Sequence, residues 1–294
     1  VYAGDTCQTI AHGVGFRFET LKDIFFYEYL SNESNKDKKK QLTPDIWELT
    51  QNFRTHNGIL FLARSLVDLI IAFFPNTIDK MNPEFSLNNG PKPLFLESSA
   101  TGNLITDLFG NSSKTIVDFG AEQVILVRDE EAKVKTLQSC GGKALVLTVL
   151  ESKGMEFDDV LLLGFFSDSP FKDDWRVIYS KFDQDFSIKK FDKKRHSALN
   201  KELKMLYVLV TRAKYRLIIA DDDIIARKPV LDYWKYHKLI DIQILDDHIR
   251  SFFNSKSGPS EWKEKGNIFM SKKQFDNAKY CYHRSGDSEL EKLA

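Results

Sequence analysis

A short polar turn between two apolar runs is the segment of this chain best suited to bind an anion. Residues 148–157, TVLESKGMEF, follow the run KALVL and precede the run DVLLL. Apolar runs of this length on either side of a polar turn indicate two buried strands. Gly154 permits positive φ or close backbone approach, and exposed N–H groups in such a turn can hold a phosphate. An ordinary surface loop has the same pattern, so the turn alone does not decide between the two.

Three other segments accompany this turn, and the four occur in a fixed order. They are residues 4–8, GDTCQ, residues 49–54, LTQNFR, residues 148–157 and residues 206–213, LYVLVTRA. Together they resemble motifs III, IV, V and VI of the UvrD/Rep-like superfamily 1 helicases, with the patterns GDxxQ, LxxNYR, TxxxxKGLEF and LYVxxTRA. The sequence around them is similar to the helicase module of large tetratricopeptide- and ankyrin-repeat-containing proteins.

The resemblance implies an ATP site in which Gln8, Arg54 and Arg212 are catalytic. Gln8 would sense the γ-phosphate or the attacking water, which suits an amide because it donates and accepts at once. The two arginines would reach the γ-phosphate, since a guanidinium is always charged and its planar fork matches phosphate oxygens. Gly154 and Glu156 would complete the nucleotide-binding set, Glu156 by accepting from a ribose hydroxyl. Two alternatives stay open: Gln8 as a turn residue that caps a helix, and Arg212 as a cation at a helix C-terminus.

Single-stranded nucleic acid, DNA or RNA, is the second ligand that the resemblance implies. Thr148 and Ser152 could contact its phosphates, because hydroxyl groups position a backbone without reading sequence. Bacterial relatives stack a Tyr and a Trp on bases just after motif III, where this chain has an alanine and a glycine. Phe16 and Arg17 could take over that task, or Phe16 could simply open the apolar face of the next helix. The ATP-site residues are thus better kept than those for nucleic acid.

The order of predicted elements points to an α/β fold. Strands alternate with helices, which predicts a parallel sheet covered on both faces, and the resemblance implies a RecA-like P-loop NTPase domain. We expect a solvated loop at residues 31–41 and a short strand at residues 46–50. The expected parts are the C-terminal edge of a first RecA-like domain at 1–16, a second RecA-like domain at 17–254, and a linker with the start of tetratricopeptide-like repeats at 255–294.

The C-terminal segment has the spacing of a helical repeat. Five residues match the aromatic and small positions of the 34-residue tetratricopeptide repeat: Trp262, Gly266, Phe269, Ala278 and Tyr282. An ordinary helical hairpin is the alternative. Because one repeat cannot bury its own face, we expect further repeats to follow, and we interpret the chain as an excerpt of a larger protein.

Composition excludes little. The 294 residues carry 42 basic and 42 acidic side chains, and zero net charge neither supports nor excludes a nucleic-acid partner. The three cysteines lie far apart, without zinc-ligand spacing, which fits a reducing compartment, so we expect the nucleus or the cytoplasm. Two charged residues interrupt the apolar run at 59–74, which favours a buried helix over a membrane span.

The functional expectation is one half of an ATP-driven motor. The expected cofactor is ATP with Mg²⁺, yet the chain has no GxxxxGK[ST] phosphate loop, so we expect the excerpt alone to be inactive, with the metal ligands elsewhere. The alternative is an ATP-gated scaffold whose repeats recruit proteins and which unwinds no strand.

Overall fold

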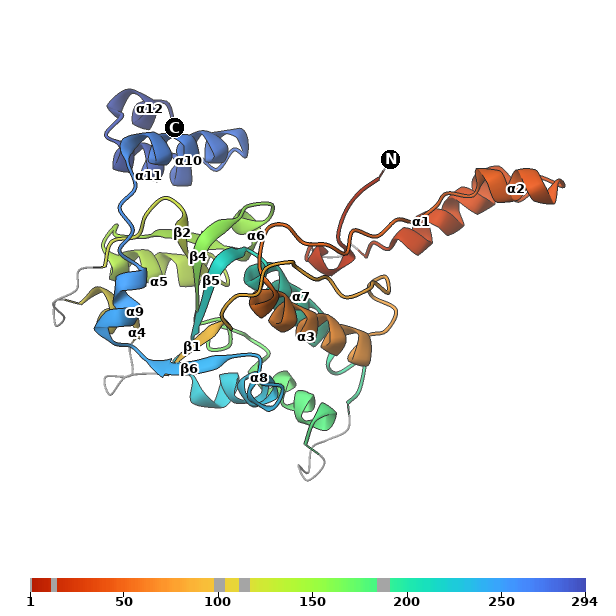
Figure 1. The fold of residues 1–294 in the computed structure, drawn as a ribbon, viewed down its shortest axis with the longest axis horizontal. Coiled ribbons are helices and arrows are strands. Elements are labelled where there is room, and N and C mark those ends of the chain that lie inside the picture. Colours follow the sequence, from red (N-terminus) through yellow and green to blue (C-terminus); the bar gives the residue numbers. More distant parts are fainter. Residues whose placement is uncertain (1, 12–14, 98–103, 111–116, 184–190) are drawn as a thin grey trace.

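The structure, a computed structural model, describes residues 2–11, 15–97, 104–110, 117–183 and 191–294. Six parallel strands form one sheet in the order β3-β2-β4-β5-β1-β6 (Figure 1). The strands are β1 Leu94–Glu97, β2 Gln123–Val127, β3 Leu145–Thr148, β4 Phe157–Leu163, β5 Ala213–Ala220 and β6 Asp241–Ile244. All of β2 is buried, as in parallel sheets covered on both faces. The predicted α/β fold is confirmed.

Helices cover the two faces of this sheet. Successive side chains of a strand point to opposite faces, so Val124 and Leu126 join one hydrophobic cluster while Ile125 and Val127 join another. The first cluster includes α3 (Asn57–Phe73), α7 (Ser197–Val210) and α8 (Ile224–Tyr236). The second includes α4 (Leu104–Phe109), α5 (Glu130–Cys140) and α9 (Asp247–Phe252). The apolar run predicted to be a buried helix is α3, and no helix among the described residues is long and apolar enough to cross a bilayer.

A helical arm near the N-terminus extends away from the sheet (Figure 1). It consists of α1 (Phe18–Phe25), a π-helical turn η2 (Phe26–Leu30) and α2 (Lys36–Leu42). The loop expected at 31–41 is therefore partly wrong: Asn35 accepts from the backbone N–H groups of Asp37 and Lys38, and this cap starts a helix. The strand expected at 46–50 is also wrong, because these residues form no strand in the part of the chain that the structure describes. An isolated bridge joins the next residue, Gln51, to Phe85.

The C-terminal residues form a helical hairpin followed by a short helix. These elements are α10 (Pro259–Ser271), α11 (Phe275–Ser285) and α12 (Ser288–Leu293). A Cβ on Gly266 would lie 2.5 Å from the Tyr282 ring, so only glycine lets α10 and α11 approach this closely. The buried face of the hairpin joins the first cluster of the α/β core. The further repeats expected after this hairpin stay a prediction.

Candidate functional site

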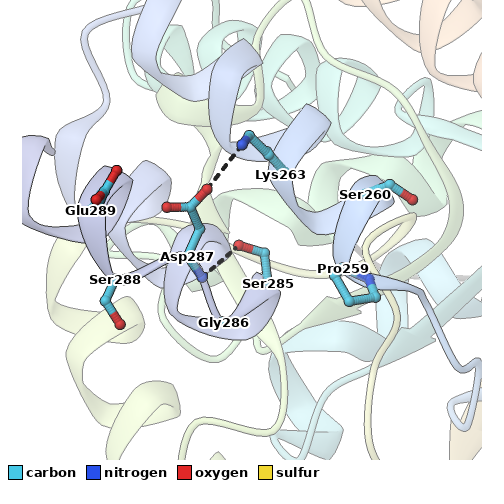
Figure 2. A pocket seen from close by; sticks show the side chains of 8 residues that line it. All are labelled: Pro259, Ser260, Lys263, Ser285, Gly286, Asp287, Ser288 and Glu289. Carbon is cyan, nitrogen blue, oxygen red and sulfur yellow. Dashed lines mark hydrogen bonds and ion pairs between the residues drawn. The ribbon is translucent and has the colours of Figure 1, made fainter.

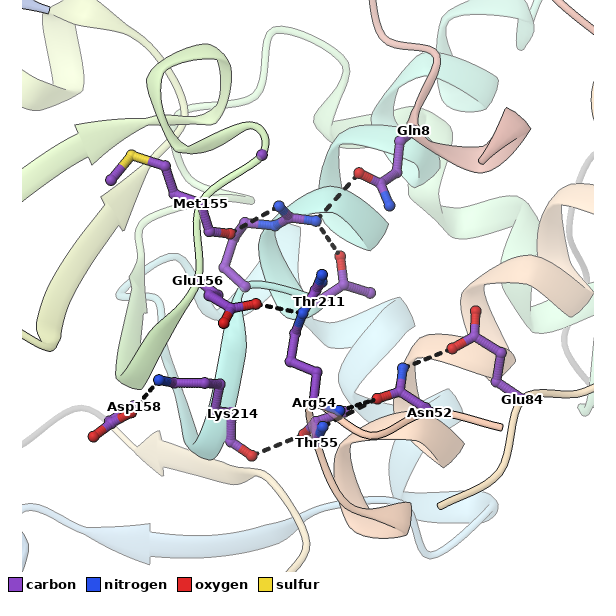
Figure 3. Close-up of polar contacts among 12 residues, drawn as sticks. Gln8, Asn52, Arg54, Thr55, Glu84, Met155, Glu156, Asp158, Thr211 and Lys214 are labelled. Atoms are coloured by element: carbon purple, nitrogen blue, oxygen red, sulfur yellow. Dashed lines mark hydrogen bonds and ion pairs between the residues drawn. The ribbon is translucent and has the colours of Figure 1, made fainter. Parts of the chain in front are cut away.

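The four segments singled out in the sequence meet at the amino ends of β4 and β5 (Figure 3). A 3₁₀ turn η1 (Thr6–Gln8) brings Gln8, and the segment before α3 brings Arg54. Between β3 and β4, α6 (Val149–Ser152) and the turn after it bring Glu156. The end of α7 brings Arg212, whose carbonyl accepts from the Phe157 N–H at 2.9 Å. Distant parts of the chain therefore supply one cluster.

Arg212 is the buried centre of this cluster. Its side chain is 2% exposed, and Nε donates to the Val208 carbonyl at 2.8 Å. Nη1 donates to the Met155 carbonyl at 2.9 Å, and Nη2 donates to Gln8 Oε1 at 3.2 Å and to Thr211 Oγ1 at 3.0 Å. The bond to Val208 bears out the helix-terminal alternative, while the other bonds join motifs III and V. Arg212 is thus the residue that holds three motifs together.

The charge of Arg212 survives its burial. Burial and then the nearby Arg54 lower the pKa of the Arg212 guanidinium to about 10. The side chain is therefore a cation throughout the neutral range, and every acceptor around it gains from a charge-assisted bond.

Arg54 lies on the open side of the same cluster. Its Nε is 2.6 Å from Glu156 Oε2, and both side chains are close to half exposed, at 45% and 47%. Arg54 and Arg212 were expected to act alike, but the structure separates them. Arg54 faces solvent in a single ion pair, whereas Arg212 is buried with four hydrogen bonds.

The backbone around Arg54 is held by residues that the sequence reasoning did not assign. Asn52 Oδ1 accepts from the N–H groups of Arg54 at 2.9 Å and Thr55 at 3.0 Å. Thr55 Oγ1 donates to the Lys214 carbonyl at 2.9 Å, and His56 Nε2 lies 2.9 Å from the Tyr215 carbonyl. A fixed asparagine in the motif IV pattern was the signal that could have revealed this role, since it forms an Asx turn before the arginine.

Gln8 is oriented through Asp5. The Asp5 carboxylate caps η1 by accepting from the Cys7 N–H at 2.8 Å, and it accepts from Gln8 Nε2 at 2.9 Å. The Tyr207 hydroxyl of motif VI donates to the same carboxylate at 3.0 Å. Burial raises the pKa of Tyr207, so the hydroxyl keeps its proton and remains a donor. With its NH₂ group on Asp5, Gln8 presents its oxygen to Arg212.

The motif V turn has the conformation that its glycine suggested. Gly154 has φ of +73°, in the left-handed region that favours glycine. Its carbonyl accepts from Lys272 of α10's C-terminal end at 3.3 Å. The turn therefore contacts both the arginine cluster and the C-terminal hairpin.

The structure does not favour the predicted nucleic-acid contacts of Thr148 and Ser152. Both are buried, at 4% and 0% exposure. Thr148 caps α6 by accepting from the Glu151 N–H, and the Ser152 hydroxyl donates to the Val149 carbonyl at 3.0 Å. In this structure both hydroxyls are used to stabilise a short buried helix.

Phe16 and Arg17 lie at the base of the helical arm. Both are half-buried, with Phe16 packed edge-to-face on Phe18 at 5.0 Å and Arg17 paired with Glu19 at 3.2 Å. They lie before α1, which has no buried residue, so the alternative of a core-facing helix is wrong for that helix. Their role in binding nucleic acid stays a prediction.

Comparison with known proteins agrees with the motifs. The family model of the UvrD-like helicase C-terminal domain matches residues 110–222. Residues 110–222 are thus similar to UvrD-like helicase C-terminal domains. The match contains Gly154, Glu156 and Arg212, while Gln8 and Arg54 lie before it.

The chain is also similar to a curated protein and to a solved structure. The chain is 37% identical to TPR and ankyrin repeat-containing protein 1 of Homo sapiens over 317 aligned positions, which cover 99% of this chain. The chain spans only 11% of that relative's length. Among solved structures, it is similar to the C-terminal domain of a possible DNA helicase from Lactobacillus plantarum, at 12% identity and a TM-score of 0.33. That similarity covers 65% of this chain and 98% of the other.

Proposed function

We propose that this chain supplies the γ-phosphate-sensing side of an ATP site in an ATP-dependent helicase or translocase. The observation that carries the proposal is the convergence of Gln8, Arg54, Glu156 and Arg212 at the ends of β4 and β5. The UvrD-like domain supports the assignment to a helicase lineage. The phosphate-binding loop would come from another part of a longer protein, because this chain contains no GxxxxGK[ST].

Arg54 is the cation that would meet the γ-phosphate. An ion pair this exposed contributes only about 0–1 kcal/mol, so a phosphate with more charge than Glu156 can displace the carboxylate at little cost. The planar guanidinium then offers two parallel N–H groups to phosphate oxygens, and Glu156 becomes free to accept from a ribose hydroxyl. This exchange needs no change in the protein core.

In this structure Arg212 positions motif III, through Gln8, and motif V, through the Met155 carbonyl. Four of its five N–H groups donate to protein oxygens, so a phosphate would compete with Gln8 for Nη2. The resulting proposal is that Gln8 and Arg212 report the phosphate to motif V, through the bond from Arg212 to the Met155 carbonyl.

Phe53 is suited to hold the nucleobase. It precedes Arg54, and its ring is 84% exposed, so a ligand can reach its face. A flat ring next to a phosphate-binding cation matches the two ends of a nucleotide, and stacking on a base contributes about 1–3 kcal/mol. The Mg²⁺ that accompanies ATP would neutralise phosphate charge, with its ligands outside this cluster, since Asp5 and Glu156 are both engaged by protein donors.

An ATP-gated scaffold is the second candidate. The burial of Thr148 and Ser152 favours it, because it removes two expected contacts to nucleic acid, and the hairpin offers tetratricopeptide-like helices for protein partners. In this candidate the nucleotide site switches conformation and no strand is unwound.

The deciding experiment is ATP hydrolysis by the full-length protein, with and without single-stranded DNA and RNA. Wild type is compared with Arg54→Ala and with Arg176→Ala, a matched control at an exposed arginine of η3 (Lys172–Lys181). Stimulation by a nucleic acid that Arg54→Ala abolishes supports the motor. Hydrolysis that Arg54→Ala abolishes but no nucleic acid stimulates supports the scaffold. Hydrolysis that is equal in the two variants contradicts the proposed site.

A further inference from the structure

The C-terminal hairpin is docked directly on the motif V turn. Gln274 Nε2 donates to the Glu151 carbonyl at 2.9 Å, and Asn277 Nδ2 donates to the Glu151 carboxylate at 2.8 Å. Lys272 Nζ donates to the Gly154 carbonyl at 3.3 Å. Three side chains from the start of α11 and the loop before it therefore bind two residues of one turn.

Glu151 receives these contacts while it holds its own helix together. One carboxylate oxygen accepts from the Thr148 N–H at 2.8 Å, which closes the capping box of α6. The other accepts from Asn277 and from Lys133 of α5, whose Nζ lies 2.5 Å away. Lys133 also donates to Asn277 Oδ1 at 3.2 Å. Asn277 is 5% exposed, so a lost partner there could not be replaced freely by water.

The docking extends beyond the turn itself. Lys265 of α10 is buried, pairs with Glu122 at 2.7 Å and lies over the Phe157 ring at 4.8 Å. Arg284 of α11 pairs with Asp118 at 3.0 Å. The apolar face of the hairpin belongs to the hydrophobic cluster that contains the motif V side chains, namely Val149, Met155 and Phe157 together with Trp262, Phe269, Ala278, Cys281 and Tyr282.

The same turn carries the contacts of the nucleotide site a few residues later. Met155 accepts from Arg212 through its carbonyl, and Glu156 pairs with Arg54. Residues 149–156 are therefore bound on one side by the arginine cluster and on the other by the hairpin. A displacement of the turn has to alter both sets of contacts.

We propose that the hairpin of α10 and α11 is a positioning element of the nucleotide site, in which Asn277 and Lys272 set the motif V turn through Glu151 and Gly154. The inference rests on the proposed function and adds a regulator of the same site: whatever binds or moves the hairpin changes the affinity for ATP. Coupling between sites is reciprocal in binding free energy, so ATP also changes how firmly the hairpin is docked.

A donor–acceptor swap in the full-length protein tests this inference. Asn277→Asp puts a second carboxylate against Glu151 with only Lys133 to neutralise both, and Glu151→Gln leaves Lys133 without its carboxylate. The double variant exchanges donor and acceptor: the Gln amide donates to the Asp carboxylate and its oxygen still accepts from Thr148. Lys133 loses its acceptor at position 151 and pairs instead with the new carboxylate at position 277, 3.2 Å from the present Asn277 oxygen. The exchange should restore kcat/KM for ATP only if the contact between positions 151 and 277 is what the single variants disrupt.

Lys263→Met is the matched control on the same hairpin. Lys263 pairs with Asp287 at 2.9 Å in a surface hollow formed by the start of α10 and the loop before α12 (Figure 2). Its described partner belongs to the hairpin segment and not to motif V. The control therefore removes a lysine and an ion pair without touching the docking contacts.

The expected result is a fall in kcat/KM for ATP of about 5–150-fold in each single variant, the usual range for coupled sites. The double variant should return to near the wild-type value, and Lys263→Met should match it. Hydrogen exchange at residues 149–156 should rise in the single variants, and in wild type ATP should slow exchange at residues 272–285 as well as in the turn.

If kcat/KM for ATP is unchanged in Asn277→Asp, the inference is overturned. This holds even if hydrogen exchange shows that the hairpin has left the motif V turn. If the single variants fail to fold, the double variant decides. The inference is overturned if the double variant also fails to fold, or if it folds without restored kcat/KM for ATP. Should the wild-type protein hydrolyse no ATP, the proposed function fails instead. The inference is then judged by exchange in the turn, and equal exchange in wild type and Asn277→Asp refutes it.

Discussion

Replacing Arg212 with alanine is expected to destabilise the fold strongly, whereas replacing Arg54 is not. The motif pattern assigns both arginines to the γ-phosphate, so the sequence predicts similar effects of substitution for Arg54 and Arg212. The structure predicts different ones, because Arg212 is 2% exposed with four hydrogen bonds and Arg54 has one exposed ion pair.

The size of the difference follows from what each substitution leaves behind. Without Arg212, the carbonyls of Val208 and Met155 and the oxygen of Gln8 lose a charged donor inside the protein. Each buried acceptor left unpaired costs about 1–3 kcal/mol, and these costs are not additive. The partners of Arg212 are all neutral, so its removal leaves no buried charge behind, and we take about 1–3 kcal/mol as the expected loss. For Arg54 the expected loss is about 0–1 kcal/mol.

The assay is urea denaturation of the 294-residue chain, followed by tryptophan fluorescence, for wild type, Arg54→Ala and Arg212→Ala. Arg212→Lys is the informative third variant, since it keeps the charge but loses the planar fork that serves several acceptors at once. A loss below about 1 kcal/mol for Arg212→Ala would refute the reasoning, because the network would then hold nothing together. Whatever the outcome, Arg54→Ala is the cleaner probe of catalysis, since lost activity in Arg212→Ala could reflect lost folding.

Three further outcomes follow from the structure. Phe53→Ala should leave stability within about 0.5 kcal/mol, as surface changes do, while weakening ATP binding by full-length protein by about 1–3 kcal/mol; equal affinities in an ATP titration would exclude stacking. Gly266→Ala should lower the unfolding free energy by about 1–3 kcal/mol, because its Cβ would lie 2.5 Å from Tyr282. Gly258→Ala, with 3.9 Å of room, is its control in the same denaturation series. Burial raises the pKa of Asp221 from 3.8 to about 6, so the folded chain binds this proton more tightly than the unfolded chain. That contribution is fully present only below the unfolded pKa of 3.8 and is lost as pH rises through 6, so from pH 4 to pH 7 wild type should lose about 2 kcal/mol relative to Asp221→Asn. If the unfolding free energies of wild type and Asp221→Asn run parallel from pH 4 to pH 7, this prediction is contradicted.

Much of the fold could be predicted because its signals are local. The apolar runs of β2, β3, β4 and β5 are continuous, as parallel strands buried on both faces require. The signals that misled were also local: the lysine-rich residues of α2 look like a loop until the Asn35 cap is recognised. Residues 46–50 have strand-like composition, yet they form no strand among the described residues. Whether a segment becomes a strand depends on a neighbouring strand that can pair with it, and the segment's own sequence does not reveal that neighbour.

The site was predicted as a set of residues but not as a geometry. While their role in an ATP site stays a prediction, motif spacing grouped Gln8, Arg54, Glu156 and Arg212, which the structure brings together. It could not tell the exposed arginine from the buried one, since exposure depends on how α7, η1 and motif V pack. Thr148 failed for the same reason: a threonine at this place in the pattern is as well suited to cap a helix as to meet a phosphate.

The motif V turn is where the two halves of the proposed function meet. Arg212 binds the Met155 carbonyl, Lys272 binds the adjacent Gly154 carbonyl, and Asn277 binds Glu151. Adjacent peptide groups cannot move independently, because only two dihedral angles separate one from the next. A phosphate that draws Arg54 away from Glu156 and shifts the turn therefore changes the contacts of the hairpin without any long pathway. Conversely, a partner that pulls on the hairpin acts on the nucleotide site through two consecutive carbonyls, so both the motor and the scaffold would require the same turn.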